Sequence, residues 1–151
     1  MKRKALTPAQ QYLFLRHNPV CVGQGTLNAT RLTWTYRVRP TPISREYEVC
    51  ITFRVNDVPR VFVISPNLTE LAGGRDLPHV YRNPLRLCLY LPGSGEWVGY
   101  MRVDKTFVPW TATWLDYFEE WLESNDWKGG GEHPNPHEGE TYSRRLRRGL
   151  R

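Results

Sequence analysis

Apolar and polar residues alternate along two stretches of the first 65 residues. The first run covers residues 31–38 and the second covers residues 46–55, and both place aromatic or β-branched residues at every other position. A shorter apolar run covers residues 61–64, after a turn predicted at Asn56 and Asp57. Period-two patterns of this kind predict half-buried strands. The three runs therefore predict an antiparallel meander with one face in the core and one wet face, on which Arg and Glu suit cross-strand pairs.

Two helices are predicted, one before and one after this meander in the sequence. Residues 7–10, Thr-Pro-Ala-Gln, form a capping-box pattern with proline at the first helical position, and the helix should end near Asn18 and Pro19. The second helix is predicted from Thr111 to about Asn125. Its apolar positions follow helical spacing, and they are Trp114, Leu115, Phe118, Trp121 and Leu122. The acidic residues on its other side are most simply a solvated surface, with partner docking as the alternative.

The long segment between residues 65 and 109 lacks regular periodicity and is rich in Gly and Pro. Connections of this length tend to be functional. The one apolar burst inside it, residues 85–91, reads as a short strand. Its leucines would share one face, and Cys88 would lie on the other face with Arg86 and Tyr90.

Cys88 therefore has two interpretations. Free cysteine is among the most buried residue types, so it can be a small apolar residue of the core. With His79 upstream, the Gly/Pro-rich turn at residues 92–95 downstream and Arg86 on its own face, it can instead be a reactive thiol that carries an acyl group. Cys50, on the polar side of its strand with no His or acid at a useful spacing, is predicted to be structural.

Composition and charge narrow the class of protein. The 151 residues carry a net charge of +6, but five arginines fall in residues 144–151 and leave about +1 for the rest, so the basicity belongs to a tail. A solvated tail is the simplest interpretation, and contact with nucleic acid or an acidic partner is the alternative. We expect one domain over residues 1–132 and a Pro-rich, then Arg-rich, flexible tail over residues 133–151.

The cysteines and histidines also argue against several kinds of site. Three cysteines without a CxxC pair disfavour a disulfide framework and a zinc ribbon. His133 and His137 lie around two prolines, which is poor spacing for a metal site, so none is predicted. No secretory signal or membrane span is expected, and we read the chain as cytoplasmic.

The order of these elements resembles the ubiquitin-conjugating enzyme fold, an α+β fold with an N-terminal helix, an antiparallel β-meander, a long active-site segment and a C-terminal helix. The resemblance runs over roughly residues 5–134 and is closer to the bacterial branch, the stand-alone conjugating-enzyme-like proteins of short type II CBASS antiphage operons. The segments that carry it are residues 77–79 (Leu-Pro-His), 87–90 (Leu-Cys-Leu-Tyr), 108–111 with 114–115, 121–122, and 127–134.

The resemblance implies a cysteine-dependent acyltransferase without a metal or cofactor. Cys88 would hold a thioester, with His79 as the second catalytic residue and a role in positioning the loop. The acyl donor would be the C-terminus of a cGAS-like nucleotidyltransferase (a CD-NTase) encoded beside it, and conjugation or priming of that cyclase would raise signalling. Such operons lack a dedicated activating partner, which leaves the source of the activated carboxylate open.

The match departs from the eukaryotic pattern at one position. There an Asn stands two residues after the His, but here the triplet is His79-Val-Tyr81. Tyr81, Asn83 or a backbone N–H is expected to take the role of that Asn. Trp97, Pro109 and Trp110 are expected to form the walls around the thiol, and plain core packing is an equally good interpretation of these three residues.

Two other function classes compete with the acyl carrier. One is a catalytically silent binding module of the same fold that scaffolds the cyclase, although such members usually lack the cysteine. The other is a small basic RNA-binding or RNase-type protein that uses His17, His79 and the arginine tail, residues that share no motif.

Overall fold

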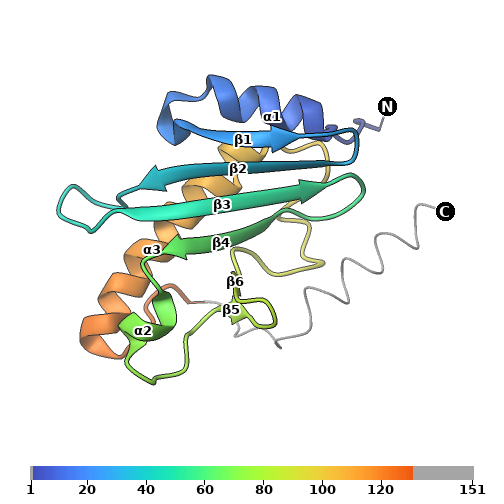
Figure 1. The fold of residues 1–151 in the computed structure, drawn as a ribbon. Helices are drawn as coiled ribbons and strands as arrows, with labels where there is room; N and C mark the ends of the chain where they lie inside the picture. Colours follow the sequence, from blue (N-terminus) through green and yellow to red (C-terminus); the bar gives the residue numbers. More distant parts are fainter. Residues whose placement is uncertain (1, 131–151) are drawn as a thin grey trace.

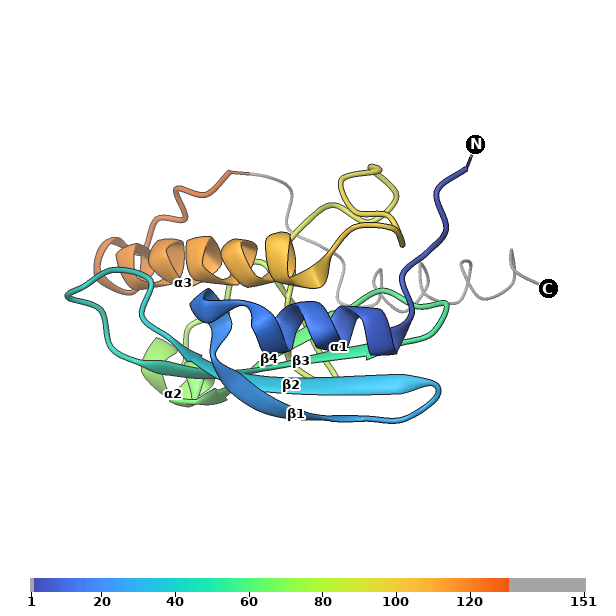
Figure 2. The ribbon, with the colours of Figure 1, turned by 90° about the horizontal axis from the view of Figure 1, so that it is seen from above.

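The computed structural model describes residues 2–130, and the predicted tail over residues 133–151 lies outside this part of the chain. A four-stranded antiparallel sheet in the order β1-β2-β3-β4 forms the centre of the fold. Its strands are β1 (Gly23–Leu27), β2 (Arg31–Val38), β3 (Tyr47–Arg54) and β4 (Arg60–Ser65). The helices α1 (Pro8–His17) and α3 (Phe107–Ser124) lie on the same side of this sheet (Figure 1, Figure 2), so the fold is α+β as expected.

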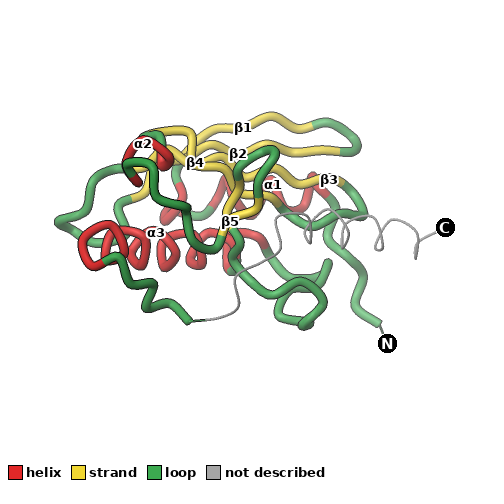
Figure 3. Tube along the Cα trace, turned by 90° about the horizontal axis from the view of Figure 1, so that it is seen from below, coloured by secondary structure: helices red, strands yellow, loops and turns green. Residues whose placement is uncertain are grey.

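The alternation along the predicted strands sets the two faces of the sheet. Leu32, Trp34 and Tyr36 of β2 are buried, as are Val49 and Ile51 of β3, and this face packs against the helices. The intervening residues are less buried and belong to the opposite face of the sheet. Figure 3 shows α3 on one side of the strands. The predicted meander is therefore confirmed, with its core between the sheet and the two helices.

Helix α1 begins and ends where the sequence predicts. Gln10 donates its N–H to the Thr7 hydroxyl (3.2 Å), and the Thr7 N–H is donated to the Gln10 side chain (2.9 Å), which completes the capping box. Helix α1 ends at His17, before Pro19. The buried Gln11 then ties α1 to the later chain, because its amide donates to the Met101 carbonyl and its side-chain oxygen accepts the Val103 N–H.

The second predicted helix begins earlier than expected. Helix α3 starts at Phe107 rather than Thr111, and Pro109 lies within its first turn. Proline is tolerated there because the first N–H groups of a helix have no partner inside it. The turn of α3 that the sequence analysis missed therefore brings Phe107 and Trp110 into the helix.

Several short elements were not predicted, whereas β6 (Arg86–Leu87) falls inside the predicted strand over residues 85–91. Strand β1 pairs with β2, but it is polar and contains Gly23 and Gly25, which lie so close to β2 that an added Cβ would collide with the Thr35 and Thr33 carbonyl groups. The segment between residues 65 and 109 contains α2 (Leu68–Ala72), β5 (Val80–Tyr81) and β6. Two 3₁₀ turns flank the long helices: η1 (Pro19–Cys21) follows α1, and η2 (Val103–Lys105) precedes α3.

Candidate functional site

A two-stranded hairpin positions Cys88. Strand β5 (Val80–Tyr81) pairs with β6 (Arg86–Leu87), which lies beside β4 of the main sheet (Figure 1). The predicted strand over residues 85–91 is thus cut to two residues. Cys88 follows directly, and its N–H is donated to the His79 carbonyl at 3.0 Å. This hydrogen bond fixes the backbone on either side of the hairpin and so the direction in which the thiol leaves it.

The Cys88 sulfur lies between two tyrosines. Its Sγ is 3.5 Å from the Tyr81 hydroxyl oxygen and 3.5 Å from the Tyr90 carbonyl oxygen, both within reach of a weak S–H donor. The Cys88 residue is neither sealed in the core nor fully exposed. The interpretation of Cys88 as a fully buried core residue is therefore wrong, because the residue is only half-buried.

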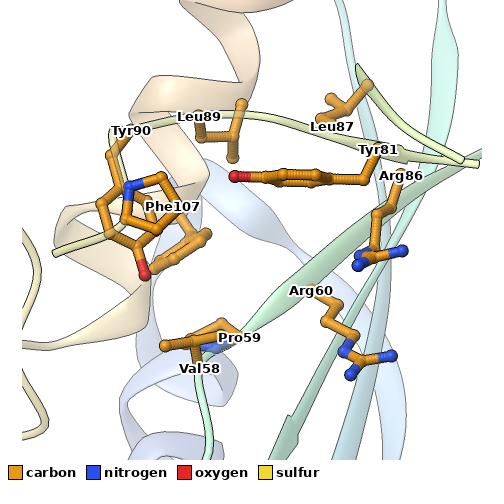
Figure 4. A pocket seen from close by; sticks show the side chains of 10 residues that line it. Val58, Pro59, Arg60, Tyr81, Arg86, Leu87, Leu89, Tyr90 and Phe107 are labelled. Atoms are coloured by element: carbon orange, nitrogen blue, oxygen red, sulfur yellow. The ribbon is translucent and has the colours of Figure 1, made fainter. Parts of the chain in front are cut away.

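A small pocket opens beside this thiol. Its volume is about 30 Å³, enough for a water-sized group, and its walls come from both the hairpin segment and the start of β4 (Figure 4). Tyr81 and Tyr90, which contact the sulfur, line this pocket. Leu87 and Leu89, the sequence neighbours of Cys88, line it as well. The lining residues are Val58, Pro59, Arg60, Tyr81, Arg86, Leu87, Leu89, Tyr90, Pro92 and Phe107.

Arg86 brings positive charge into this pocket. Its guanidinium carbon lies 4.9 Å from the centre of the Tyr81 ring, and one of its nitrogens donates to the Pro84 carbonyl at 3.2 Å. The whole residue is 3% exposed. Arg86 and Cys88 both contact Tyr81, the arginine at its ring and the sulfur at its hydroxyl, although strand β6 ends at Leu87 and the predicted alternation of faces does not reach Cys88.

His79 supports the site through its backbone. It is buried at a positive φ of 46°, and its carbonyl accepts the Trp114 Nε1–H at 3.0 Å as well as the Cys88 N–H. Its imidazole stacks on Trp127 with ring centres 5.0 Å apart. The His79 carbonyl thus connects α3 to the hairpin beside Cys88, and the positioning role of His79 stays a prediction.

The hairpin does not bring Asn83 to the sulfur. Asn83 is exposed in the four-residue turn between β5 and β6, so both ladder pairs of the hairpin separate it from the hydrogen bond between His79 and Cys88. Of the two side chains expected to replace the missing motif Asn, only Tyr81 reaches the thiol. The order of residues alone could not show this, since Asn83 is nearer to Cys88 in sequence.

The two tryptophans that were predicted to support the site, Trp97 and Trp110, are buried to different degrees. Trp97 is buried in the core, edge-on to Phe107 (5.7 Å) and Phe53 (6.4 Å). Trp110 is half-buried and lies 6.1 Å from the Tyr90 ring. Phe107 also meets the Tyr90 ring edge-on at 5.9 Å. The first turn of α3 thus packs behind Tyr90, whereas Trp97 packs one layer further from the sulfur.

Sequence reasoning missed the contribution of β4. Val58, Pro59 and Arg60 form one wall of the pocket, although nearly thirty residues separate them from Cys88. Phe107 was missed for a related reason, because the predicted helix began after it. These residues carry no local motif, so they are revealed only by the packing of β6 beside β4 and by the position of the first turn of α3 at the pocket.

The other two cysteines are placed differently from Cys88. Cys21 is fully buried, and burial, with a smaller contribution from the Asp104 carboxylate, raises the pKa of its thiol to about 11. Cys50 is half-buried on the outer face of β3, on the polar side where the sequence predicts it.

The search for metal sites and membrane spans covers residues 2–130. No group of three His, Cys, Asp or Glu side chains in this range is arranged to hold a metal ion. No helix in the same range is long and apolar enough to cross a membrane. His133 and His137 lie outside the described residues.

Fold and site together define an α+β domain that presents a half-exposed cysteine beside a small pocket. A comparison with protein families matches residues 11–134 to the family described as Type II CBASS E2 protein. The chain belongs to this family, whose role is in CBASS antiphage signalling together with other CBASS components. A comparison with curated proteins finds no match.

Proposed function

We propose that this protein is a thioester carrier and that Cys88 holds the acyl group. The observation that carries the proposal is the half-buried Cys88, whose backbone N–H is held by the His79 carbonyl and whose sulfur contacts two tyrosines that line a pocket. The family supports a conjugating role within CBASS. The proposed acyl donor is the C-terminus of the cGAS-like nucleotidyltransferase (CD-NTase) of the same operon, and the proposed result is conjugation or priming of that cyclase.

The chemistry is acyl exchange onto sulfur. Cys88 attacks the carbonyl carbon of an already activated C-terminus, for example a thioester; the new S–C bond forms, the bond to the leaving group breaks, and the leaving group takes up the thiol proton. A thiol near its ordinary pKa of about 8.5 is a few per cent thiolate at neutral pH. That fraction suffices for exchange with an activated carbonyl. An amine or thiol then accepts the acyl group and releases the Cys88 thiol.

Tyr81 is the proposed replacement for the missing motif Asn. Its hydroxyl can accept from the Cys88 thiol, as the 3.5 Å contact shows, and it can donate once that proton has left. A donor at this place stabilises negative charge on the sulfur or on the oxygen of the tetrahedral intermediate. His79 is a positioning residue in this scheme, because its carbonyl rather than its ring contacts Cys88.

A thiol-sensitive adduct tests the carrier. The protein is co-expressed with the cyclase of its operon, and lysates are compared on reducing and non-reducing gels. We expect an adduct that disappears with reductant and in Cys88→Ala but persists in Cys50→Ala, the matched control on the outer face of β3. Stable co-purification of the two proteins with no adduct would instead support the catalytically silent scaffold.

A second pair of variants tests Tyr81. We expect Tyr81→Phe to slow adduct formation by about tenfold to a hundredfold, because the loss of one donor to a developing oxyanion has an effect of this order or larger. Tyr117→Phe, on α3 against Trp127, is the control and should match the wild type. Equal rates for wild type and Tyr81→Phe would remove Tyr81 from the mechanism and leave the carrier role of Cys88 intact.

A further inference from the structure

Three arginines gather in a hollow on the outer face of the main sheet. The hollow has a volume of about 230 Å³ and contains Arg31 at the start of β2, Arg54 at the end of β3 and Arg60 at the start of β4. Their neighbours in sequence, Leu32, Phe53 and Val61, are buried in the core, so the arginines lie on the face opposite α1 and α3. The remaining lining residues are Thr52, Asp57, Val58 and Phe62.

The pairing register of the strands brings like charges together, which lowers the stability of the sheet. Arg31 lies directly opposite Arg54, and like charges in that position destabilise a sheet. The other end of the same two strands follows the opposite rule, because Arg37 lies opposite Glu48 and the two form an ion pair at 3.8 Å. The predicted Arg–Glu pairing therefore holds at one end of the face and is wrong at the other.

The cluster is not neutralised by the described part of the chain. Within residues 2–130, no hydrogen bond or ion pair involves the side chains of Arg31, Arg54 or Arg60. Asp57 is the one carboxylate among the lining residues, and it is buried and accepts the Val58 N–H at 2.8 Å. Three guanidinium groups against one carboxylate leave a positive hollow, and guanidinium is the group best shaped to bind carboxylates.

The hollow adjoins the pocket beside Cys88. Val58 and Arg60 line both, and Figure 4 shows Arg60 and Arg86 together at one side of the pocket. From Arg60 the positive charge extends across neighbouring strands to Arg54 and Arg31. Two strand spacings amount to about 10 Å, the length of roughly three residues of extended chain. A peptide that ends at the sulfur can therefore continue over the hollow.

We propose that the hollow binds acidic side chains of the polypeptide whose C-terminus reacts at Cys88, a few residues before that C-terminus. This inference rests on the proposed function, and it adds a specificity-determining surface to it. A polypeptide is favoured over a nucleic acid because the hollow also contains Thr52, Val58 and Phe62, and because it shares Val58 and Arg60 with the pocket whose walls include Tyr81 and Tyr90. Carboxylates on the donor would relieve the repulsion between Arg31 and Arg54.

The adduct assay with charge-reversed variants tests this surface. Arg31→Glu combined with Arg54→Glu is compared with Arg16→Glu combined with Arg45→Glu, which makes the same charge change at exposed positions outside the hollow. We expect the first variant to form about tenfold less adduct and the control to match the wild type. Alkylation of Cys88 at the wild-type rate in both variants shows that the thiol site is intact.

The possible failures are distinguishable. Equal adduct from the two charge-reversed variants would overturn the role of the hollow and leave the carrier function standing. No Cys88-dependent adduct in the wild type would overturn the carrier function itself.

A binding measurement isolates the charge preference. Fluorescence anisotropy compares a labelled ten-residue peptide with four glutamates, its glutamine counterpart, and a ten-nucleotide single-stranded DNA, each with the full-length protein. We expect the glutamate peptide to bind at least about tenfold more tightly than the glutamine peptide, and only when Arg31 and Arg54 are present. Equal binding of the two peptides, or tighter binding of the DNA through the same two arginines, would contradict the proposal.

Discussion

At the scale of single residues, the three cysteines share a side chain and differ in everything around it. Cys21 is enclosed in the core, Cys50 lies half-buried on the sheet, and Cys88 lies at a pocket with Tyr81 and Tyr90 against its sulfur. Thiol chemistry requires both access and the thiolate form. The environment therefore sorts these cysteines by reactivity before any partner is considered.

Iodoacetamide labelling followed by peptide mass spectrometry checks this order. At pH 7.5 we expect Cys88 to be modified in the native protein and Cys21 to be protected, because Cys21 is buried and its pKa is raised to about 11. At that pH a thiol with so high a pKa is ionised about three hundred times less often than an ordinary one with a pKa of about 8.5. Denaturant should abolish the difference. Equal labelling of both cysteines in the native protein would contradict the described placement.

At the scale of elements, the sequence predicts what local patterns control. The capping box at Thr7 and Gln10, and the alternation of β2 and β3, depend on neighbours within a few residues, and both are found. Strand β1 has no such pattern, since its glycines serve the close approach to β2. The hairpin that presents Cys88 is equally hidden, because two-residue strands carry almost no periodicity.

The candidate site divides in the same way. Cys88, His79 and Tyr81 could be singled out from the sequence, since residue type and order mark them. Val58, Arg60 and Phe107 could not, because they reach the pocket through the packing of β4 and α3 against the hairpin. The choice of Tyr81 over Asn83 also required the hairpin geometry.

Asp104 links the end of α1 to η2, just before α3, and its hydrogen bonds give a prediction about the pH dependence of stability. Burial acts to raise the pKa of its carboxyl, but hydrogen bonds from Arg102 (2.7 and 2.9 Å) and Asn18 (3.0 Å) outweigh burial and lower it. The carboxylate therefore stabilises the fold at neutral pH, and this contribution is lost as the pH falls from the ordinary carboxyl value through the lower folded one.

Urea unfolding of Asp104→Asn measures that contribution. At pH 7 we expect the free energy of unfolding to fall by about 2 kcal/mol, since a buried, charge-assisted set of hydrogen bonds is weakened. The loss should shrink below about pH 4, where the wild-type carboxylate begins to take up protons in the unfolded chain. Asp116→Asn, whose side chain makes no hydrogen bond or ion pair within residues 2–130, is the control. A penalty that does not change with pH would contradict the account.

At the scale of the whole molecule, the two faces of the sheet have separate tasks. One face packs against α1 and α3 and holds the core, while the other presents the arginine hollow beside the Cys88 pocket. The domain boundary near residue 132 and the arginine tail stay predictions, since they lie beyond residue 130. In the proposed function, this arrangement places the acyl group at one edge of the sheet and the binding surface for the donor polypeptide on the adjoining face.

The most direct measurement is the position and lability of the acyl group on the native chain. Trypsin releases residues 87–102 as a peptide whose single cysteine is Cys88. Protein purified from cells that contain the cyclase should yield this peptide bearing the C-terminal residues of its partner, and hydroxylamine should remove them. Partner residues attached at the same level in Cys88→Ala, or absent from this peptide while present on another cysteine, would show that Cys88 is not the carrier.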